Sequence, residues 1–162
     1  MSLAIRAARA ADTDLIFALV RELAEYEKLL AHVDATREMI AAALFSQTPR
    51  VFADIAEWSG EGVGLSVWFY NFSSFRGRHG IYLEDLFVRP AYRGRGIGKA
   101  LMMRLAQRCV AEKLGRFEWA VLDWNAPSIA LYRAIGATVM DDWRICRMSG
   151  EPLATFARGM AS

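Results

Sequence analysis

The order of patterns between residues 81 and 123 constrains the fold most. A strand-like apolar run at 81–88 is followed by a glycine-rich turn and then by a helical pattern at 97–114. Gly115 ends that helix, and a second strand-like run covers 117–123. A strand, a helix and a strand in this order are typical of a parallel crossover. We therefore predict an α/β fold, in which a mixed sheet carries helices packed on it.

The elements before this segment are predicted from periodicity and turn signals. Asp12 is expected to cap a helix whose apolar i, i+4 pattern continues to Leu30. Thr36 is expected to cap a second helix that ends near Phe45. Strand-like runs lie at 4–8, 51–57, 63–72 and 81–88. Short turns separate the last three runs, so they are predicted to form an antiparallel meander.

After residue 123 the pattern predicts a short helix at 127–134, a stop at Gly136 and a last strand at about 143–148. The chain has 162 residues and shows no repeat or linker. That length fits one domain of ordinary size. We therefore expect a single domain over 1–162.

Composition excludes several classes of protein. Twenty basic and eighteen acidic residues leave a net charge of +2, so we expect no nucleic-acid partner. No apolar run is long enough to span a bilayer, so we expect no membrane partner. Cys109 and Cys146 belong to no CxxC or Cys/His cluster, and we expect two buried thiols and no metal site. Free thiols and the absence of a secretory pattern in this sequence predict a cytoplasmic protein.

The turn between the strand and the long helix carries the clearest chemical signal. Gly94, Gly96 and Gly98 let a ligand approach the backbone closely, and the helix N-terminus offers unpaired amide donors. Basic side chains of the same segment, Arg89, Arg93, Arg95 and Lys99, add positive charge. These features predict a phosphate-binding loop.

Two common phosphate-binding motifs do not fit this loop. A Walker P-loop requires a glycine where this chain has Arg93 and a hydroxyl where it has Ala100. The dinucleotide pattern GxGxxG fails because Lys99 follows Gly94 and Gly96 at the third glycine position. An RNA-contacting Arg-Gly segment is a further interpretation, although such segments are usually repeated and disordered.

The pattern Arg93-x-x-Gly96-x-Gly98 resembles the pyrophosphate loop of the GCN5-related N-acetyltransferases, the GNAT superfamily. The likeness is to the branch of diamine (spermidine/spermine) and thialysine acetyltransferases. It extends to the segments 5–8, 22–27, 82–88, 123–132 and 136–137. The resemblance implies a mixed sheet splayed open between its fourth and fifth strands. It also implies acetyl-CoA as cosubstrate, a small-molecule amine as substrate and a homodimer.

The resemblance further implies which residues contact the coenzyme. Backbone groups of Leu86 and Val88 are expected to bind the pantetheine arm. The amide of Asn125 can contact pantetheine as well, or it can cap the helix that Pro127 begins. The expected coenzyme contacts are Leu86, Val88, Arg93, Gly94, Arg95, Gly96, Ile97, Gly98, Lys99, Asn125, Ser128 and Tyr132.

Catalytic roles also follow from the resemblance. Tyr132 is expected to be the general acid that protonates the departing thiolate, although a lone helical tyrosine is more often core. Glu84 is expected to be the base, acting through water, while Asp85 attracts the cationic substrate. A salt bridge to an arginine is the structural alternative for this acidic pair. The expected substrate contacts are Tyr26, Glu27, Glu84, Asp85 and Trp143. Glu27 alone would be a solvated residue, and Trp143 alone a packing residue.

The substrate class is predicted from charge. Polyamine-acetylating relatives carry extra acids where this chain has Lys28-Leu29-Leu30-Ala31, and their loop before the Glu-Asp pair is more acidic. We therefore expect a lysine-like amino acid whose carboxylate meets Arg76 or Arg78. A non-catalytic acyl-CoA-binding module and an RNA-binding protein are the alternative functions.

Overall fold

The computed structural model describes residues 2–159, which form two units, the first ending at Ala120 and the second beginning at Val121. The first unit contains a five-stranded sheet in the order β1-β2-β3-β4-β5. Its strands are β1 (Leu3–Ala7), β2 (Phe52–Trp58), β3 (Glu61–Ser73), β4 (Arg78–Val88) and β5 (Phe117–Trp119). Neighbouring strands are antiparallel except β4 and β5, which are parallel. The predicted mixed sheet, meander and crossover are therefore confirmed.

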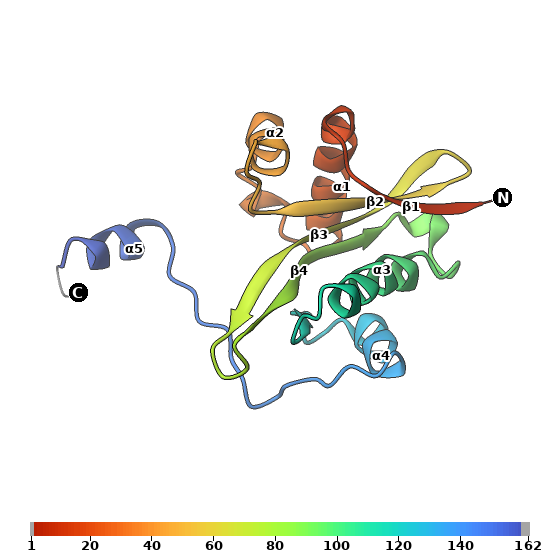
Figure 1. Cartoon of the computed structure of the whole chain (residues 1–162). Coiled ribbons are helices and arrows are strands. Elements are labelled where there is room, and N and C mark those ends of the chain that lie inside the picture. The colour runs from red at the N-terminus through yellow and green to blue at the C-terminus, as the bar shows by residue number, and fades with distance from the viewer. Residues whose placement is uncertain (1, 160–162) are drawn as a thin grey trace. The chain divides into compact units, whose positions relative to one another are not determined.

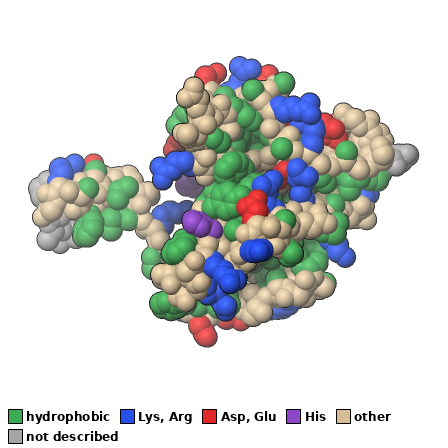
Figure 2. Space-filling view, in the orientation of Figure 1, with side chains coloured by type: hydrophobic (Ala, Val, Ile, Leu, Met, Phe, Trp, Pro, Cys, Tyr) green, Lys and Arg blue, Asp and Glu red, His purple; other side chains and the backbone are tan. Residues whose placement is uncertain are grey.

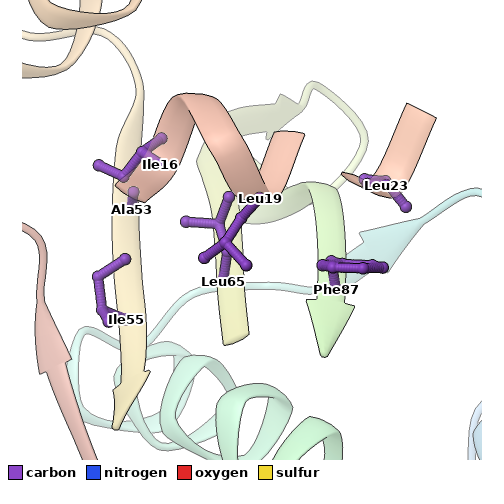
Figure 3. Close-up of a cluster of buried hydrophobic side chains, with 7 residues drawn as sticks. All are labelled: Ile16, Leu19, Leu23, Ala53, Ile55, Leu65 and Phe87. Carbon is purple, nitrogen blue, oxygen red and sulfur yellow. The ribbon is translucent and has the colours of Figure 1, made fainter. Parts of the chain in front are cut away.

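Helices cover both faces of this sheet (Figure 1). The helices α1 (Thr13–Tyr26) and α2 (Arg37–Phe45) lie on one face, and α3 (Ile97–Ala111) lies on the other. The cluster on the α1 face consists of Ile16, Leu19, Leu23, Ala53, Ile55, Leu65 and Phe87 (Figure 3). The cluster on the α3 face consists of Ala56, Val63, Ile97 and Leu101. Short 3-10 turns lie at Ala10–Asp12, Leu30–His32 and Pro90–Tyr92.

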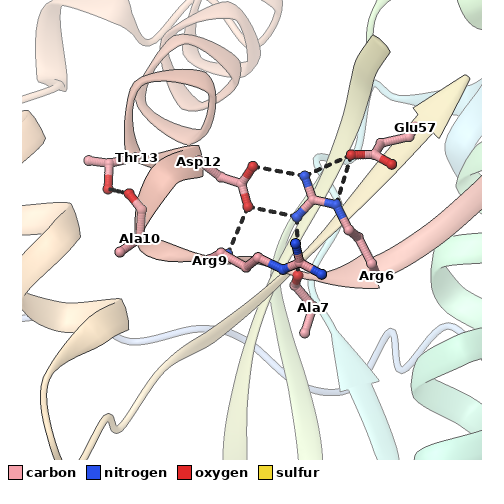
Figure 4. A network of polar contacts seen from close by, with 7 residues as sticks. All are labelled: Arg6, Ala7, Arg9, Ala10, Asp12, Thr13 and Glu57. Carbon is pink, nitrogen blue, oxygen red and sulfur yellow. Dashed lines mark hydrogen bonds and ion pairs between the residues drawn. The ribbon is translucent and has the colours of Figure 1, made fainter. Parts of the chain in front are cut away.

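The starts of the first two helices differ from one another. The Thr36 hydroxyl accepts a hydrogen bond from the Met39 amide at 3.2 Å, which confirms the predicted cap of α2. Asp12 is the N-cap residue of α1, as predicted, but its carboxylate bonds no amide of that helix. It accepts instead from the Arg6 guanidinium and the Arg9 amide, each at 2.7 Å (Figure 4). Arg6 holds the pKa of Asp12 below its usual range and also bonds Glu57 on β2.

The predicted end of α1 also lies too far along the chain. The helix ends at Tyr26, and Leu30 lies in a separate 3-10 turn. Lys28 between them has a positive φ of 62°, a conformation in which a helix cannot continue. The apolar spacing therefore extends beyond the end of the helix.

A β-bulge in β4 changes which residues face each helix layer. Trp68 pairs with Leu83 and Val67 pairs with Asp85, so Glu84 is the extra residue between the two pairs. Because directly paired residues share a face, one inserted residue moves every later side chain to the opposite face. Asp85 consequently lies on the face of Val67, which packs against the α1 cluster.

The ladder between β4 and β5 is short. Its register joins Ile81, Tyr82 and Leu83 to Phe117, Glu118 and Trp119. Within the described residues, the stretch 84–88 of β4 has no strand on its β5 side. The strand predicted over 117–123 is therefore only three residues long. The sheet opens between its fourth and fifth strands, as the resemblance implied.

The second unit contains α4 (Ala126–Ala134) and α5 (Gly150–Ala157). The strand predicted at about 143–148 was wrong, because this segment pairs with no described strand. A strand needs a neighbour for its backbone donors and acceptors, and alternating apolar residues alone do not supply one. Cys146 is exposed rather than buried, whereas Cys109 is half-buried and burial raises its pKa.

Across residues 2–159 no helix is both long and apolar enough to cross a membrane.

Gly80 tests the packing at the crowded start of the β4–β5 pair. A Cβ there would lie 2.7 Å from the Arg116 carbonyl oxygen and 2.6 Å from Asn71 Oδ1. We expect Gly80→Ala to lower the free energy of unfolding by about 1–3 kcal/mol, because backbone must shift to relieve the overlap. Gly98→Ala is the matched control, since its Cβ would meet nothing closer than 3.9 Å. Thermal unfolding of both variants checks this, and equal melting temperatures would contradict the overlap.

Candidate active site

The glycine loop has a backbone that only glycine adopts readily. Gly94 and Gly96 have φ values of 76° and 77°, in the left-handed region. A Cβ on either residue would meet nothing within 4 Å, so open space lies over the loop. Gly96 is also the N-cap residue of α3, and it makes no side-chain hydrogen bond to the first amides of the helix. The first amides of α3 therefore form a donor set suited to a phosphate.

The arginines of this loop are engaged elsewhere. Arg93 Nε donates to the Val88 carbonyl at 2.9 Å, and the Arg93 amide donates to the Pro90 carbonyl at 3.2 Å. The Arg93 guanidinium lies over the Tyr26 ring, 4.5 Å from its centroid. Arg95 lies similarly over Trp58, at 5.1 Å. The sequence did not indicate these contacts. They give no support to the predicted role of the two arginine side chains as phosphate ligands.

The substrate-side residues of the first unit gather where α1 ends beside β4. Glu84 and Glu27 both raise the pKa of Asp85, so the three carboxylates lie within electrostatic reach of one another. Burial is the largest cause, and together these causes raise the pKa of Asp85 to about 7. Burial also raises the pKa of Glu27. Tyr26, directly before Glu27, completes this end of the helix. We call Glu27, Glu84 and Asp85 the acidic triplet.

The salt-bridge alternative for the Glu84–Asp85 pair does not hold. None of the ion pairs found between residues 2 and 159 includes a member of the acidic triplet. The nearest arginine in the sequence, Arg89, directly after β4, bonds Glu22 on α1 at 2.9 Å. The carboxylates of the triplet are thus available to a cation.

The remaining predicted residues belong to the second unit. The Asn125 side chain accepts from the Ser128 amide at 3.4 Å, so the capping interpretation of Asn125 is confirmed. Ser128 and Tyr132 are four residues apart on α4 and therefore share a face. Tyr132 is buried, with 9% of its surface exposed, whereas Trp143 is 76% exposed. Contact between these residues and the first unit stays a prediction.

Arg76 lies in the turn before β4, at the end of the strand remote from Val88. Arg78 begins the strand and Glu84 is six residues later, a distance of about 20 Å at the usual rise of a strand. The two arginines line a cavity of about 430 Å³ with Phe75, Leu114 and Gly115. Contact between these arginines and the substrate carboxylate stays a prediction.

The described residues hold no group of three or more His, Cys, Asp or Glu side chains arranged to bind a metal ion.

Comparison with known proteins agrees with the loop and the sheet. The profile of the acetyltransferase (GNAT) family matches residues 14–137. The chain belongs to the GNAT family. It is therefore an N-acetyltransferase with the mixed sheet of that family.

Individual relatives of this GNAT enzyme carry informative names. It is 37% identical to the thialysine N-epsilon-acetyltransferase of Bos taurus, over 94% of this chain and 96% of that protein. It is 42% identical to an L-ornithine N5-acetyltransferase of Arabidopsis thaliana, over 56% of this chain and 40% of that protein. An integron cassette protein from the mobile metagenome of V. cholerae has a similar structure. That likeness has a TM-score of 0.80 at 26% identity and covers 98% and 99% of the two chains.

Proposed function

We propose that this enzyme transfers an acetyl group from acetyl-CoA to the side-chain amine of a small amino acid of the thialysine, lysine or ornithine type. The observation that carries the proposal is the acidic triplet, which concentrates negative charge where α1 ends beside β4. Three carboxylates in one place suit a single ammonium group. The names of the thialysine and ornithine acetyltransferases among its relatives support the same substrate class.

The glycine loop fits the pyrophosphate of the coenzyme. The space over Gly94 and Gly96 and the amides at the start of α3 match a doubly charged group that must approach the backbone. We propose that the amides of 94–99 and the Lys99 ammonium hold the pyrophosphate. Leu86 and Val88, on the stretch of β4 without a β5 partner, would hold the pantetheine arm with Asn125, Ser128 and Tyr132. When bound, the coenzyme supplies the reactive thioester.

The proton transfers follow from the charges of the reactants. An alkylammonium has a pKa of about 10.4 and no lone pair, so it must lose a proton before nitrogen attacks the thioester carbonyl. A carboxylate of the triplet removes this proton, and the resemblance assigns that role to Glu84, acting through water. As the carbon–sulfur bond breaks, the Tyr132 hydroxyl donates a proton to the thiolate. The second amine proton leaves as the amide forms.

The domain organisation, the oligomeric state and the cellular location are also part of the proposal. The family match crosses residue 120, where the two units meet in sequence, which supports a single domain. Resemblance supports a homodimer, and two cysteines outside any disulfide support a cytoplasmic location. On the face seen in Figure 2, Lys and Arg side chains lie scattered among hydrophobic and acidic ones. That distribution favours the enzyme over the RNA-binding alternative.

Substrate selectivity tests the proposal. We expect thialysine or lysine to have at least a tenfold higher kcat/KM than spermidine, a difference of about 1.4 kcal/mol. The triplet can pair one ammonium, whereas each further ammonium of a polyamine would be desolvated without a partner. Release of free thiol, measured with thialysine, lysine, ornithine, putrescine and spermidine, gives these constants.

Two results of the amine panel would contradict the proposal. A clear preference for spermidine would show that counting carboxylates misleads here. Absence of thiol release with every amine, in protein that still binds coenzyme A, would favour the non-catalytic module.

A further inference from the structure

The bulge in β4 separates two adjacent carboxylates. Glu84 is the inserted residue and is exposed, whereas Asp85 is half-buried. If β4 alternated regularly, Asp85 would share the face of Leu83, which pairs with Trp68. With the inserted residue, Asp85 shares the face of Val67 and Phe87, against which α1 packs. The bulge therefore turns one carboxylate inward beside the end of α1 and leaves the other in solvent.

The charges around Asp85 come from β4 and from the end of α1. Glu84 precedes it on β4, and Glu27 follows the last residue of α1. The free carbonyls at the end of a helix carry partial negative charge, which adds to that of Glu27. From β3, Val67 and Trp68 offer no titratable group. From the glycine loop, Arg93 is committed to the Tyr26 ring and the Val88 carbonyl.

We propose that Asp85, and not Glu84, is the carboxylate that takes the proton from the substrate's ammonium. The inference rests on the proposed function and corrects its assignment of the base. The nitrogen–hydrogen bond breaks, a carboxylic acid forms on Asp85, and the freed lone pair attacks the thioester carbonyl. The Asp85 proton then passes to water. Glu84, which is exposed to solvent, attracts the cation, and its negative charge keeps Asp85 basic.

The proton affinity of Asp85 suits this role. Burial and its two carboxylate neighbours raise its pKa to about 7. A general base works best when its pKa lies near the working pH, because it is then both deprotonated and basic. A fully solvated carboxylate would hold a proton about a thousandfold less tightly, since unperturbed values are near 4.

The test compares the pH dependence of kcat/KM in three proteins with lysine or thialysine as substrate. In the wild type we expect activity to fall below pH of about 7, where Asp85 becomes protonated. Asp85→Asn should lose this limb and at least a hundredfold in kcat/KM. Glu84→Gln should keep the limb but move it to lower pH, because removing a neighbouring negative charge lowers the pKa of Asp85.

A second measurement does not depend on activity. Carbon NMR of side-chain carboxyls in the free protein should show one aspartate that titrates near pH 7, whose signal is absent from Asp85→Asn. Glu38→Gln, which removes a surface carboxylate on α2, is the matched control and should change neither the signal nor the pH profile.

We expect Asp85→Asn to fold and, above pH 7, to be at least as stable as the wild type. The reason is that a raised carboxyl pKa makes the charged form destabilising there.

The outcomes separate the two proposals. An active wild type whose acidic limb disappears in Glu84→Gln and persists in Asp85→Asn overturns this inference and restores Glu84 as the base. An aspartate signal that titrates near pH 4 at Asp85 also overturns it. A wild type that acetylates no amine overturns the proposed function together with the inference.

Discussion

Gly96→Asp is expected to abolish coenzyme binding while the protein stays folded. The new carboxylate would point into the open space over the loop, where no protein atom lies within 4 Å of its Cβ. At about 4 Å from a phosphate charge, a unit negative charge costs about 4 kcal/mol at an effective dielectric of about 20. We therefore expect the affinity for coenzyme A, measured by calorimetry, to fall by about a thousandfold or more.

Gly96→Asn separates charge from strain in this experiment. Asparagine has the same size as aspartate and also tolerates the positive φ of 77° at this position. It carries no charge, so we expect a much smaller loss of affinity than with aspartate. Circular dichroism and melting temperatures establish that both variants fold. Unchanged affinity in folded Gly96→Asp would remove the loop as the phosphate site.

Tyr132→Phe is expected to lower turnover by about a hundred- to ten-thousandfold and to leave coenzyme binding intact. The expected loss is typical for removing a general acid, since the thiolate would then depart without a proton donor. Phenylalanine keeps the ring in this buried position, so packing should be preserved. Steady-state rates from pH 6 to 10 measure the effect, and calorimetry measures the affinity for coenzyme A.

Tyr70→Phe is the matched control for this substitution. Its hydroxyl donates to Glu112 at 2.7 Å on an exposed part of the first unit, and neither residue is assigned a catalytic role. We expect full activity in that variant. Full activity of Tyr132→Phe across the same pH range would instead mean that solvent or another side chain protonates the thiolate.

Local sequence determined the elements that carry the proposed coenzyme site. Gly94 and Gly96 occupy positions that require left-handed backbone, and the periodicity from Ile97 onward predicts the helix whose amides face the loop. Thr36 was recognised as a cap for the same reason, because the cap and its amide are only three residues apart. In each case the deciding interactions are formed between residues close in sequence.

Interactions between distant residues decided what local patterns did not. Asp12 looks like a helix cap, but its carboxylate binds Arg6, whose guanidinium also bonds Glu57 on the distant strand β2. The pattern at 143–148 looks like a strand, but a strand exists only where another strand offers its edge.

The acidic site shows both contributions most clearly. The sequence placed Glu84 and Asp85 together in an apolar strand, which indicated a function because unpaired buried carboxylates are costly. Which of them is inward depends on the register between β3 and β4, where Val67 and Trp68 are matched around one extra residue. Register arises from packing along both strands, so it cannot be derived from either strand alone. The sequence thus indicated acid–base chemistry in this strand, and the tertiary structure decided which carboxylate faces the end of α1.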